Sequence, residues 1–418
     1  MIRNGKKKAI SCALVAAMSV GLAACGTTSY DFKVSYDGIK TGDVSSKVSV
    51  HDPSILKADG EYYIFGSHMS AAKSSDLLNW EKVADGYSKK NPVYGQIYDV
   101  ADEAFAYSGS KNSLIKTDDK QVHVWAPDVI YNETTGLYYM YYCTTSTWNA
   151  SNLCYGTSTT PEGPYEWQGA LIYSGFNRKT ISGTDVLDYV DEDYAYKNYI
   201  KGAQYNYEDY PNAIDPTVFY DADGRMWMVY GSWSGGIFLL EIDKTTGLVI
   251  HPEADKANNV DPYYGKRLLG GGHISIEGPY IMYDETSGYY YLFVSYGALT
   301  SNGGYQVRVF RSKTVDGEYV DMNGKYPEKS AQHQNFGLKL TGNYKLPSLE
   351  KAYMATGHNS AFVDDDGRMY LVYHTRFNDN GEGHSPRVHQ MLVNEDGWPC
   401  ELPYHCLLYT SDAADEAR

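Results

Sequence analysis

The sequence contains no long apolar run after its first 25 residues. A helical membrane span needs about 20 consecutive apolar residues, so no later segment is expected to cross a bilayer. Basic residues are also in the minority, because 36 Lys and Arg face 52 Asp and Glu and leave a formal net charge of −16. This balance disfavours nucleic acid and other polyanionic partners. Tyrosine, by contrast, is abundant at 42 residues and favours strands.

Cysteine is rare in the body of the chain. Of six cysteines, Cys12 and Cys25 lie near the N-terminus, while Cys143 and Cys154 flank the polar stretch CTTSTWNASNLC between two expected strands. In an exported protein these two could form a disulfide, which requires Cβ atoms about 3.5 to 4.5 Å apart. The alternative is a pair of buried thiols, and the sequence leaves both open.

The first 25 residues have the pattern of an export signal. Several basic residues precede a short apolar run over residues 9–22, and small residues follow. Leu22-Ala23-Ala24-Cys25 resembles a bacterial lipobox, in which the cysteine becomes the lipidated first residue. We therefore predict an exported lipoprotein that meets the membrane only through its lipid anchor at Cys25, with residues 26–47 as a tether. The alternative is an ordinary secretory signal with a chance cysteine.

Residues 406–418, CLLYTSDAADEAR, do not match the rest of the chain. They resemble the translation of a sequencing adapter, so we interpret them as an artefact that replaces the natural C-terminus after about His405. On that interpretation a closing strand of the last blade or a further small β-domain is lost. The alternative is an ordinary flexible tail.

One sequence pattern recurs five times and organises the chain. In each copy, a strand rich in Tyr, Val and Ile is followed by an Asp/Gly turn and a second such strand, which is typical of a hairpin. A propeller blade needs roughly 40 to 50 residues or more. The repeat therefore predicts one all-β domain, a five-bladed β-propeller over residues 48–405. The turn glycines recur every 64 to 88 residues, at Gly60, Gly136, Gly224, Gly288 and Gly367.

Three acidic residues and a histidine stand at matching places in these copies. Asp52, Asp215, Glu277 and His358 precede the first strand of copies one, three, four and five, and Trp125 of the segment WAPDV occupies this region in copy two. The innermost strands of a propeller surround a central channel, so these side chains are expected to meet at its mouth. Taken singly each signal is weak, because Asp before Pro is a common turn former. Their shared position favours a functional role.

Carboxylates around one channel mouth suit the hydrolysis of a glycosidic bond with inversion. That reaction needs a carboxylate to activate water and a carboxylic acid to protonate the leaving oxygen, about 6.5 to 9.5 Å apart. A third carboxylate raises the pKa of the acid through like-charge repulsion.

The motifs HDPS, WAPDV, IDPTVF, IEGPY and GHNS, in this order, resemble those of glycoside hydrolase family 43 and especially its endo-1,5-α-L-arabinanases. The segment GSWSGGI over residues 231–237 resembles the third-blade loop of that group. The resemblance implies that Asp52 is the general base, Glu277 the general acid and Asp215 the residue that tunes and orients the acid. It also implies a five-bladed propeller and cleavage of internal bonds in arabinan, a neutral pectic side chain.

The resemblance implies further site residues. His358 matches a channel histidine that helps to hold calcium or a similar ion, largely through water, whereas the alternative is a hydrogen-bonded core histidine. No organic cofactor is implied. Some tryptophans and an arginine are also implied as substrate contacts; the alternative is that the tryptophans lie in the core and the arginine on a strand surface. The expected substrate contacts are Trp125, Trp148, Trp233, Arg387 and His389.

Two long polar segments, residues 87–120 and 176–210, interrupt the repeat and are expected to wall the cleft. Their shape decides between an open groove for internal cleavage and a pocket for terminal cleavage. Two alternatives therefore stay open. One is an exo-acting β-xylosidase or α-L-arabinofuranosidase of the same family, and the other is a glycan-binding lipoprotein without activity.

Overall fold

The computed structural model describes residues 46–117, 122–146, 149–327, 335–346, 351–377 and 383–405. All of them belong to one compact unit, Thr41–Arg418, and a separate unit, Met1–Lys40, lies outside the described residues. The expected export signal with Cys25, most of the tether, Trp148 and residues 406–418 also fall outside the description. No helix among the described residues is long and apolar enough to span a membrane.

In the described residues, five antiparallel blade sheets follow one another along the chain, each built from consecutive strands, and a separate two-stranded sheet stands between the second and third. The third blade sheet has the order β11-β12-β13-β16-β15, with β14 paired to β13, and the other blade sheets contain four strands in sequence order. By blade, the strands are β1 (Ser54–Ala58), β2 (Glu61–Gly66), β3 (Ser70–Ser74) and β4 (Glu81–Ala84); β5 (Val124–Asn132), β6 (Leu137–Thr145), β7 (Ser151–Ser158) and β8 (Glu166–Tyr173); β11 (Thr217–Tyr220), β12 (Met226–Tyr230), β13 (Ile237–Ile242), β14 (Val249–Ile250), β15 (Val260–Asp261) and β16 (Gly265–Leu269); β17 (Ile276–Asp284), β18 (Tyr289–Tyr296), β19 (Gln306–Ser312) and β20 (Leu338–Lys339); β21 (Met354–Val363), β22 (Met369–Arg376), β23 (Ser385–Val393) and β24 (Pro399–His405).

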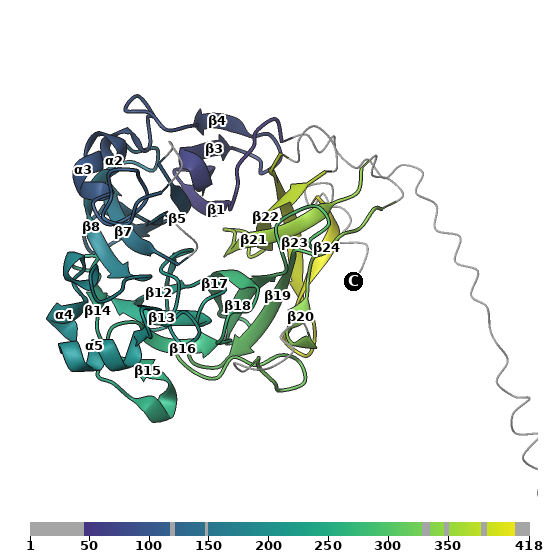
Figure 1. Cartoon of the computed structure of the whole chain (residues 1–418). Coiled ribbons are helices and arrows are strands. Elements are labelled where there is room, and N and C mark those ends of the chain that lie inside the picture. The colour runs from purple at the N-terminus through teal and green to yellow at the C-terminus, as the bar shows by residue number, and fades with distance from the viewer. Residues whose placement is uncertain are drawn as a thin grey trace, which may run out of the picture. The chain divides into compact units, whose positions relative to one another are not determined.

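The first strands of the five sheets form a closed ring. Strands β1, β5, β11, β17 and β21 each contact the first strand of the next sheet, and β21 contacts β1 in turn. Figure 1 shows the blades following one another around this ring from purple to yellow. The expected five-bladed propeller and its five hairpins are confirmed. The turn glycines adopt left-handed φ angles of +64° to +80°, which cost glycine little.

Apolar packing is divided among five clusters, each between two neighbouring blades. The cluster between the last and first blades includes Ile64 and Val372, both fully buried. Ser360 adds a polar link across this junction, because its Oγ donates to Pro53 O at 2.8 Å and accepts from Ile55 N–H at 3.1 Å. Among the described residues no strand of the first blade joins the last sheet. The ring is therefore closed by packing and hydrogen bonds.

The two long polar segments fold onto the propeller. Segment 87–120 contains α2 (Gly95–Asp99) and α3 (Ala101–Ala104), and its apolar side chains join the cluster between the first and second blades. Segment 176–210 joins the cluster between the second and third blades. Its elements are η2 (Ile181–Gly183), α4 (Val186–Tyr189), α5 (Glu192–Asn198), β9 (Ile200–Lys201) and β10 (Gln204–Tyr205); the other 3₁₀ turns are η1 (Ser67–Met69) and η3 (Lys256–Asn258).

The two cysteines of the second blade are free, buried thiols. Cys143 of β6 pairs with Leu153 of β7, and Cys154 pairs with Tyr142. Because side chains alternate between the two faces of a sheet, Cys143 joins one interblade cluster and Cys154 the other. The thiols thus lie on opposite faces of the sheet, and the alternative of two buried thiols holds.

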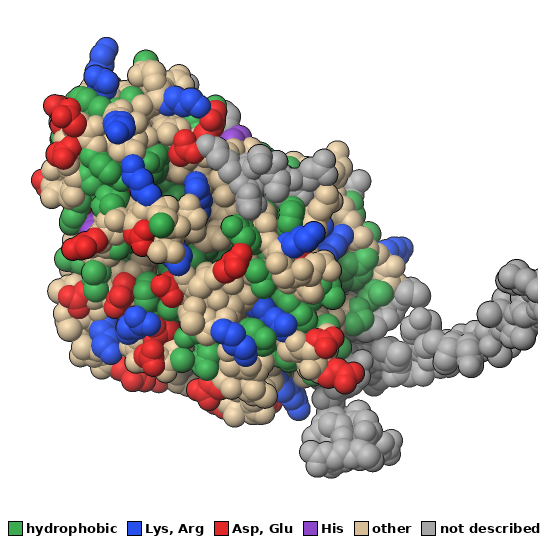
Figure 2. Space-filling model, turned by 90° about the horizontal axis from the view of Figure 1, so that it is seen from below, with side chains coloured by type: hydrophobic (Ala, Val, Ile, Leu, Met, Phe, Trp, Pro, Cys, Tyr) green, Lys and Arg blue, Asp and Glu red, His purple; other side chains and the backbone are tan. Residues whose placement is uncertain are grey.

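On the face shown in Figure 2, acidic and basic side chains are interspersed among apolar ones. No single sign of charge dominates that face.

Candidate active site

A left-handed backbone residue stands at the same place in every blade, where the chain begins its first strand. The φ angles are 56° at Asp52, 41° at Ala126, 55° at Asp215, 57° at Gly278 and 48° at His358. This conformation costs a non-glycine residue about 1–2 kcal/mol, and such strain concentrates at functional sites. The expected alignment was wrong in one detail. Gly278 occupies the repeated position of the fourth blade, so the acidic residue of that blade comes one position earlier.

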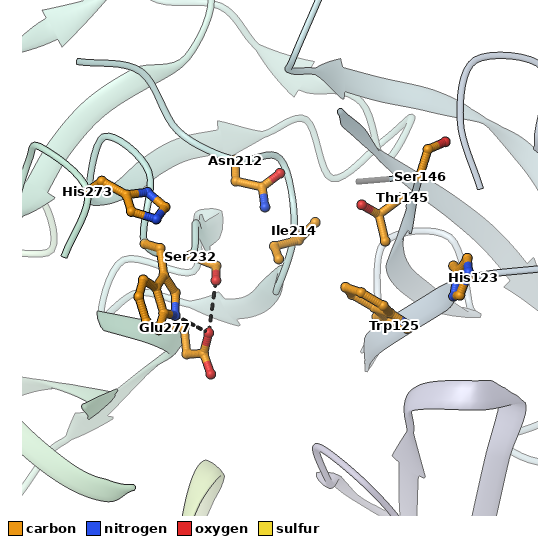
Figure 3. A pocket seen from close by; sticks show the side chains of 10 residues that line it. His123, Trp125, Thr145, Ser146, Asn212, Ile214, Ser232, His273 and Glu277 are labelled. Atoms are coloured by element: carbon orange, nitrogen blue, oxygen red, sulfur yellow. Dashed lines mark hydrogen bonds between the residues drawn. The ribbon is translucent and has the colours of Figure 1, made fainter. Parts of the chain in front are cut away.

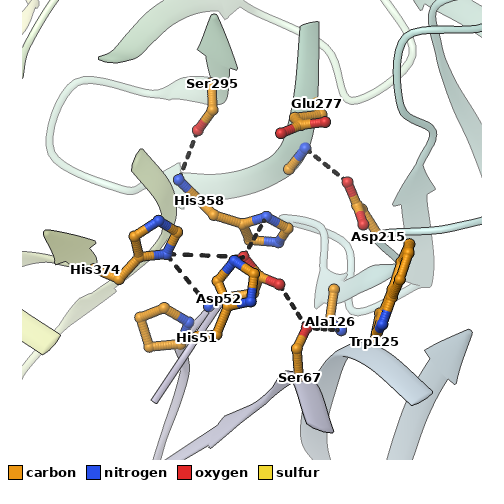
Figure 4. A network of polar contacts seen from close by, with 12 residues as sticks. His51, Asp52, Ser67, Trp125, Ala126, Asp215, Glu277, Ser295, His358 and His374 are labelled. Atoms are coloured by element: carbon orange, nitrogen blue, oxygen red, sulfur yellow. Dashed lines mark hydrogen bonds and ion pairs between the residues drawn. The ribbon is translucent and has the colours of Figure 1, made fainter. Parts of the chain in front are cut away.

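Asp52 lies at the centre of a polar network (Figure 4). Its Oδ1 is 3.1 Å from Nδ1 of His358 and 3.1 Å from Nε2 of His51. Its Oδ2 accepts a hydrogen bond from Ser67 Oγ, which itself accepts from Ala126 N–H at 2.9 Å. Burial opposes ionisation of Asp52, but the imidazole of His358 and the other neighbours outweigh it and lower the pKa of this carboxyl. Asp52 is therefore ionised.

His358 lies between the carboxylates and carries the compensating charge. Its backbone N–H donates to Ser295 Oγ at 2.7 Å. Burial alone would lower the pKa of the imidazole, but the carboxylates of Asp52, Asp215 and Glu277 raise it above the ordinary value. The protonated ring then stabilises the ionised Asp52 beside it.

Glu277 is held by three donors from neighbouring loops and strands. Its Oε2 accepts from Trp233 Nε1 at 2.8 Å and from Ser232 Oγ at 3.0 Å, and its Oε1 accepts from Tyr305 OH at 2.8 Å. Burial and the negative charge of Asp52 nevertheless raise the pKa of Glu277. The two carboxyl groups therefore favour opposite protonation states, and they come from blades that are not neighbours in the ring.

Asp215 is tied to the backbone next to Glu277. Its Oδ2 accepts from Gly278 N–H at 3.1 Å. Burial, together with the negative charges of Glu277 and Asp52, raises the pKa of Asp215 to about 7. Asp215 and Glu277 thus titrate as an interacting pair.

A pocket of about 490 Å³ opens beside Glu277. In Figure 3, Glu277 and Trp125 lie on opposite sides of this pocket. Trp233 is a further lining residue, so two of the tryptophans expected to contact substrate do face a cavity. The full lining is His123, Trp125, Thr145, Ser146, Asn212, Ile214, Ser232, Trp233, His273 and Glu277.

Arg387 and His389 lie away from this pocket. Arg387 is only 2% exposed, and its guanidinium faces the rings of Tyr353 and Phe377. The imidazole Nδ1 of His389 lies 2.8 Å from Leu402 O inside the last blade. Neither residue lines the pocket beside Glu277, so the structure does not bring them to the position expected of substrate contacts.

Comparison with known proteins decides the family. The family model described as glycosyl hydrolases family 43 matches residues 44–210 and 191–399. The chain belongs to glycosyl hydrolases family 43. It is 37% identical over 401 residues to extracellular endo-α-(1→5)-L-arabinanase 2 of Bacillus subtilis, covering 90% of this chain and 74% of that protein. It is 39% identical over 368 residues to the extracellular endo-α-(1→5)-L-arabinanase of Thermotoga petrophila, covering 85% and 70%.

Solved structures agree with this family assignment. The crystal structure of endo-1,5-α-L-arabinanase from Thermotoga petrophila superposes with a TM-score of 0.71 at 39% identity, covering 87% of this chain and 76% of that one. The glycoside hydrolase family 43 YxiA protein of Bacillus licheniformis gives a TM-score of 0.70 at 39% identity, with coverages of 85% and 74%. The chain is thus a glycoside hydrolase with the propeller of this family.

A set of three histidines bears on metal binding in this family 43 chain. Within the described part of the chain, one set of three His, Cys, Asp or Glu ligand atoms converges, namely His51, His374 and His384, within 4.8 Å of one another. Asp52 N–H already donates to His374 Nδ1 at 3.3 Å, and Arg376 to His384 Nε2 at 2.7 Å. These contacts occupy one ring nitrogen each of His374 and His384, whereas Nε2 of His374 has no hydrogen-bond partner among the described residues. His358 is not part of such a set, so it fits calcium only where water supplies most ligands.

Several site residues were missed by sequence reasoning. Ser67, Ser232 and Tyr305 hold the carboxylates, and His273 lines the pocket. Ser232 lies in GSWSGGI, the segment already singled out, and His273 lies in the glycine-rich run before Glu277. For Ser67 and Tyr305 the sequence offers no comparable signal.

Proposed function

We propose that this chain is an inverting endo-hydrolase of α-1,5-linked arabinan. One observation carries the proposal: the carboxyl groups of Asp52, Asp215 and Glu277 lie around the imidazole of His358 (Figure 4), beside a pocket that Glu277 itself lines. The substrate class rests on the relatives of 37% and 39% identity, both named extracellular endo-α-(1→5)-L-arabinanases.

In this mechanism Asp52 is the general base. The ionised carboxylate removes a proton from a water molecule while the water oxygen attacks the anomeric carbon, and the bond from that carbon to the leaving oxygen breaks. Ser67 and His358 stabilise the charged form of the base through the contacts described above. Attack from the side opposite the leaving group inverts the configuration.

Glu277 is the general acid and gives its proton to the leaving oxygen. Burial keeps this carboxyl protonated at higher pH than usual, which matches the task of an acid. Asp215 orients and tunes it, since Asp215 accepts from the backbone N–H of Gly278 and a negative charge on either carboxyl opposes ionisation of the other. After release of both products, Asp52 returns its proton to solvent and Glu277 regains one.

Substrate contacts come from the pocket walls. Trp125 and Trp233 offer flat apolar faces to arabinofuranosyl rings. Trp233 also donates to Glu277, so it positions the acid as well. A calcium ion at His358 is part of this proposal. Held mainly by water, it would supply the positive charge beside the three carboxylates, and the imidazole of His358 would then be neutral.

Export and anchoring complete the proposed function. Both relatives named above are called extracellular, which supports export of this chain. Lipidation at Cys25 rests on the lipobox pattern alone. Metabolic labelling with a radioactive fatty acid should mark the wild-type protein and leave Cys25→Ala unlabelled.

The products of linear arabinan test the activity. Arabino-oligosaccharides in the first minutes of digestion are expected. Free arabinose alone would support the exo-acting alternative. One relative, 27% identical, is named an exo-α-(1→5)-L-arabinofuranosidase of Cellvibrio japonicus. Glu277→Gln should abolish hydrolysis while the protein still binds arabinan. Binding without turnover by the wild-type protein would support a non-catalytic glycan-binding role. Loss of hydrolysis on addition of a chelator would support the proposed calcium ion, and unchanged hydrolysis would argue against it.

A further inference from the structure

A second pocket, of about 410 Å³, adjoins the one beside Glu277. His273 lines both pockets, and the loop that places Ser232 in the first places Ser234 in the second. None of the described residues that line the second pocket is Glu277 or carries another carboxylate. Its lining is Asn149, Gly175, Asn177, Gln204, Tyr205, Tyr207, Ser234 and His273.

The second pocket presents hydrogen-bonding groups that the protein leaves unused. Within the described residues, the side-chain amides of Asn149 and Gln204 and the hydroxyl of Tyr207 have no hydrogen-bond partner. Asn177 accepts Lys179 N–H at 2.8 Å through Oδ1, which leaves its Nδ2 to donate. Amide groups both donate and accept, so this set matches neighbouring hydroxyl groups of a sugar.

The pocket is also electrically neutral. Among the described residues, no Lys, Arg, Asp or Glu lines it. Burial lowers the pKa of His273, so this ring is uncharged at neutral pH. A neutral oligosaccharide fits such a lining, whereas a uronic acid chain would find no cation to pair with its carboxylates.

Backbone contacts hold the walls of the pocket in place. A Cβ on Gly175 would lie 2.2 Å from Asn149 O, and a Cβ on Gly235 would lie 2.3 Å from the carbonyl carbon of Tyr210. Only glycine permits these approaches. Gly272 N–H also donates to Glu208 O at 2.7 Å. Segment 176–210 is thus fastened to the loop that carries Ser234, and the pocket is formed before ligand arrives, which lowers the entropic cost of binding.

We propose that this second pocket is a distal subsite for neutral furanose units of the same polysaccharide, beyond those at the reacting bond. The proposal rests on the proposed function and deepens it. A chain that fills both pockets is held by units remote from the chemistry, which favours long substrates over short ones. Segment 176–210, which supplies Asn177, Gln204 and Tyr207, is then the part of the chain that sets preference for substrate length.

Steady-state kinetics on arabinotriose and on arabinohexaose test this subsite. Gln204→Ala removes an exposed side chain, and Asn177→Asp keeps the Lys179 contact while it removes the Nδ2 donor. Each variant should raise KM for arabinohexaose about fivefold, as expected for one lost hydrogen bond, with kcat and the values for arabinotriose unchanged. Gln168→Ala, on the exposed edge strand β8, is the matched control and should leave both substrates unaffected.

Equal losses for both substrates, or none for either, would overturn the distal subsite. If the wild-type protein hydrolyses no arabinan, the proposed function fails, and calorimetric titration with arabinohexaose then decides the subsite separately. If the wild-type protein binds arabinohexaose and Gln204→Ala binds it more weakly, the distal subsite is still supported. Unweakened binding, or equal binding of oligogalacturonate, would reject it.

Discussion

The imidazole of His358 lies directly on the bare backbone of Gly278. A Cβ atom at position 278 would be 3.0 Å from Cγ and 3.1 Å from Nδ1 of that ring. The same Nδ1 is 3.1 Å from Asp52. The glycine of the fourth blade thus sets the position of a histidine of the fifth blade, which in turn contacts the carboxylate of the first.

Gly278→Ala should therefore displace His358 and weaken the proposed base. We expect kcat on arabinan to fall at least tenfold, and stability to fall by about 1–2 kcal/mol from the left-handed backbone alone. Gly60→Ala is the matched control, because Gly60 also has a positive φ but a Cβ added there would meet no atom within 4 Å. It should lose similar stability and keep its activity. Equal kcat values for Gly278→Ala and Gly60→Ala would show that the contact between the His358 ring and the backbone of Gly278 does not matter for activity.

Trp233→Phe should keep the ring in the pocket and remove the hydrogen bond to Glu277. A hydrogen bond to a neutral carboxyl contributes about 0.5–1.5 kcal/mol, so we expect kcat/KM to fall by roughly twofold to tenfold. Trp227→Phe loses an equivalent bond, from Nε1 to Asp221 Oδ2 at 2.8 Å, outside the pockets described above. Full activity in Trp233→Phe would show that the indole N–H does not position the acid.

Activity should decline on the alkaline side as the proposed acid loses its proton. Burial raises the pKa of Glu277, and its partner Asp215 has a pKa raised to about 7. Asp215→Asn removes the carboxyl that titrates together with Glu277, so Glu277 loses its proton without a second negative charge opposing it and the alkaline limb of kcat/KM should move to lower pH. Asp366→Asn, in an exposed turn, is the control. An unmoved alkaline limb in Asp215→Asn would contradict the coupling of the two carboxyls.

Asp128 should make stability depend on pH without taking part in catalysis. It accepts from Ser54 Oγ and from Val218 N–H, and burial raises its pKa to about 7. The folded protein keeps this proton up to about pH 7, whereas the unfolded chain releases it near the ordinary pKa of about 4. Its contribution to stability therefore falls as pH rises between these values.

Asp128→Asn should remove that slope. We compare the unfolding free energies of the variant and the wild-type protein by urea denaturation. The difference, variant minus wild type, should be about 2 kcal/mol larger at pH 8 than at pH 5. A difference between variant and wild type that is the same at both pH values would show that Asp128 is ionised in the folded state throughout.

The hairpins were predictable from sequence because their causes are local. Asp/Gly turns and strands rich in Tyr, Val and Ile lie next to each other in the chain, and their five copies predicted the ring of first strands around the channel. The same repeat brought Asp52, Asp215 and His358 to one place. The repeat aligned Glu277 with Asp52 and Asp215, but the structure shows that Gly278 holds the repeated left-handed position and that Glu277 comes one residue earlier.

The tertiary structure alone decided which groups meet between blades. Asp52 meets His358 of the last blade, and Glu277 meets Trp233 of the third, through contacts that depend on how separate sheets face one another. The pKa values follow from burial and from these distant partners, so no local pattern contains them. The sequence by itself determined a five-bladed propeller with carboxylates at its mouth. Packing between blades determined which carboxylate keeps its proton, because protonation responds to charges that only folding brings together.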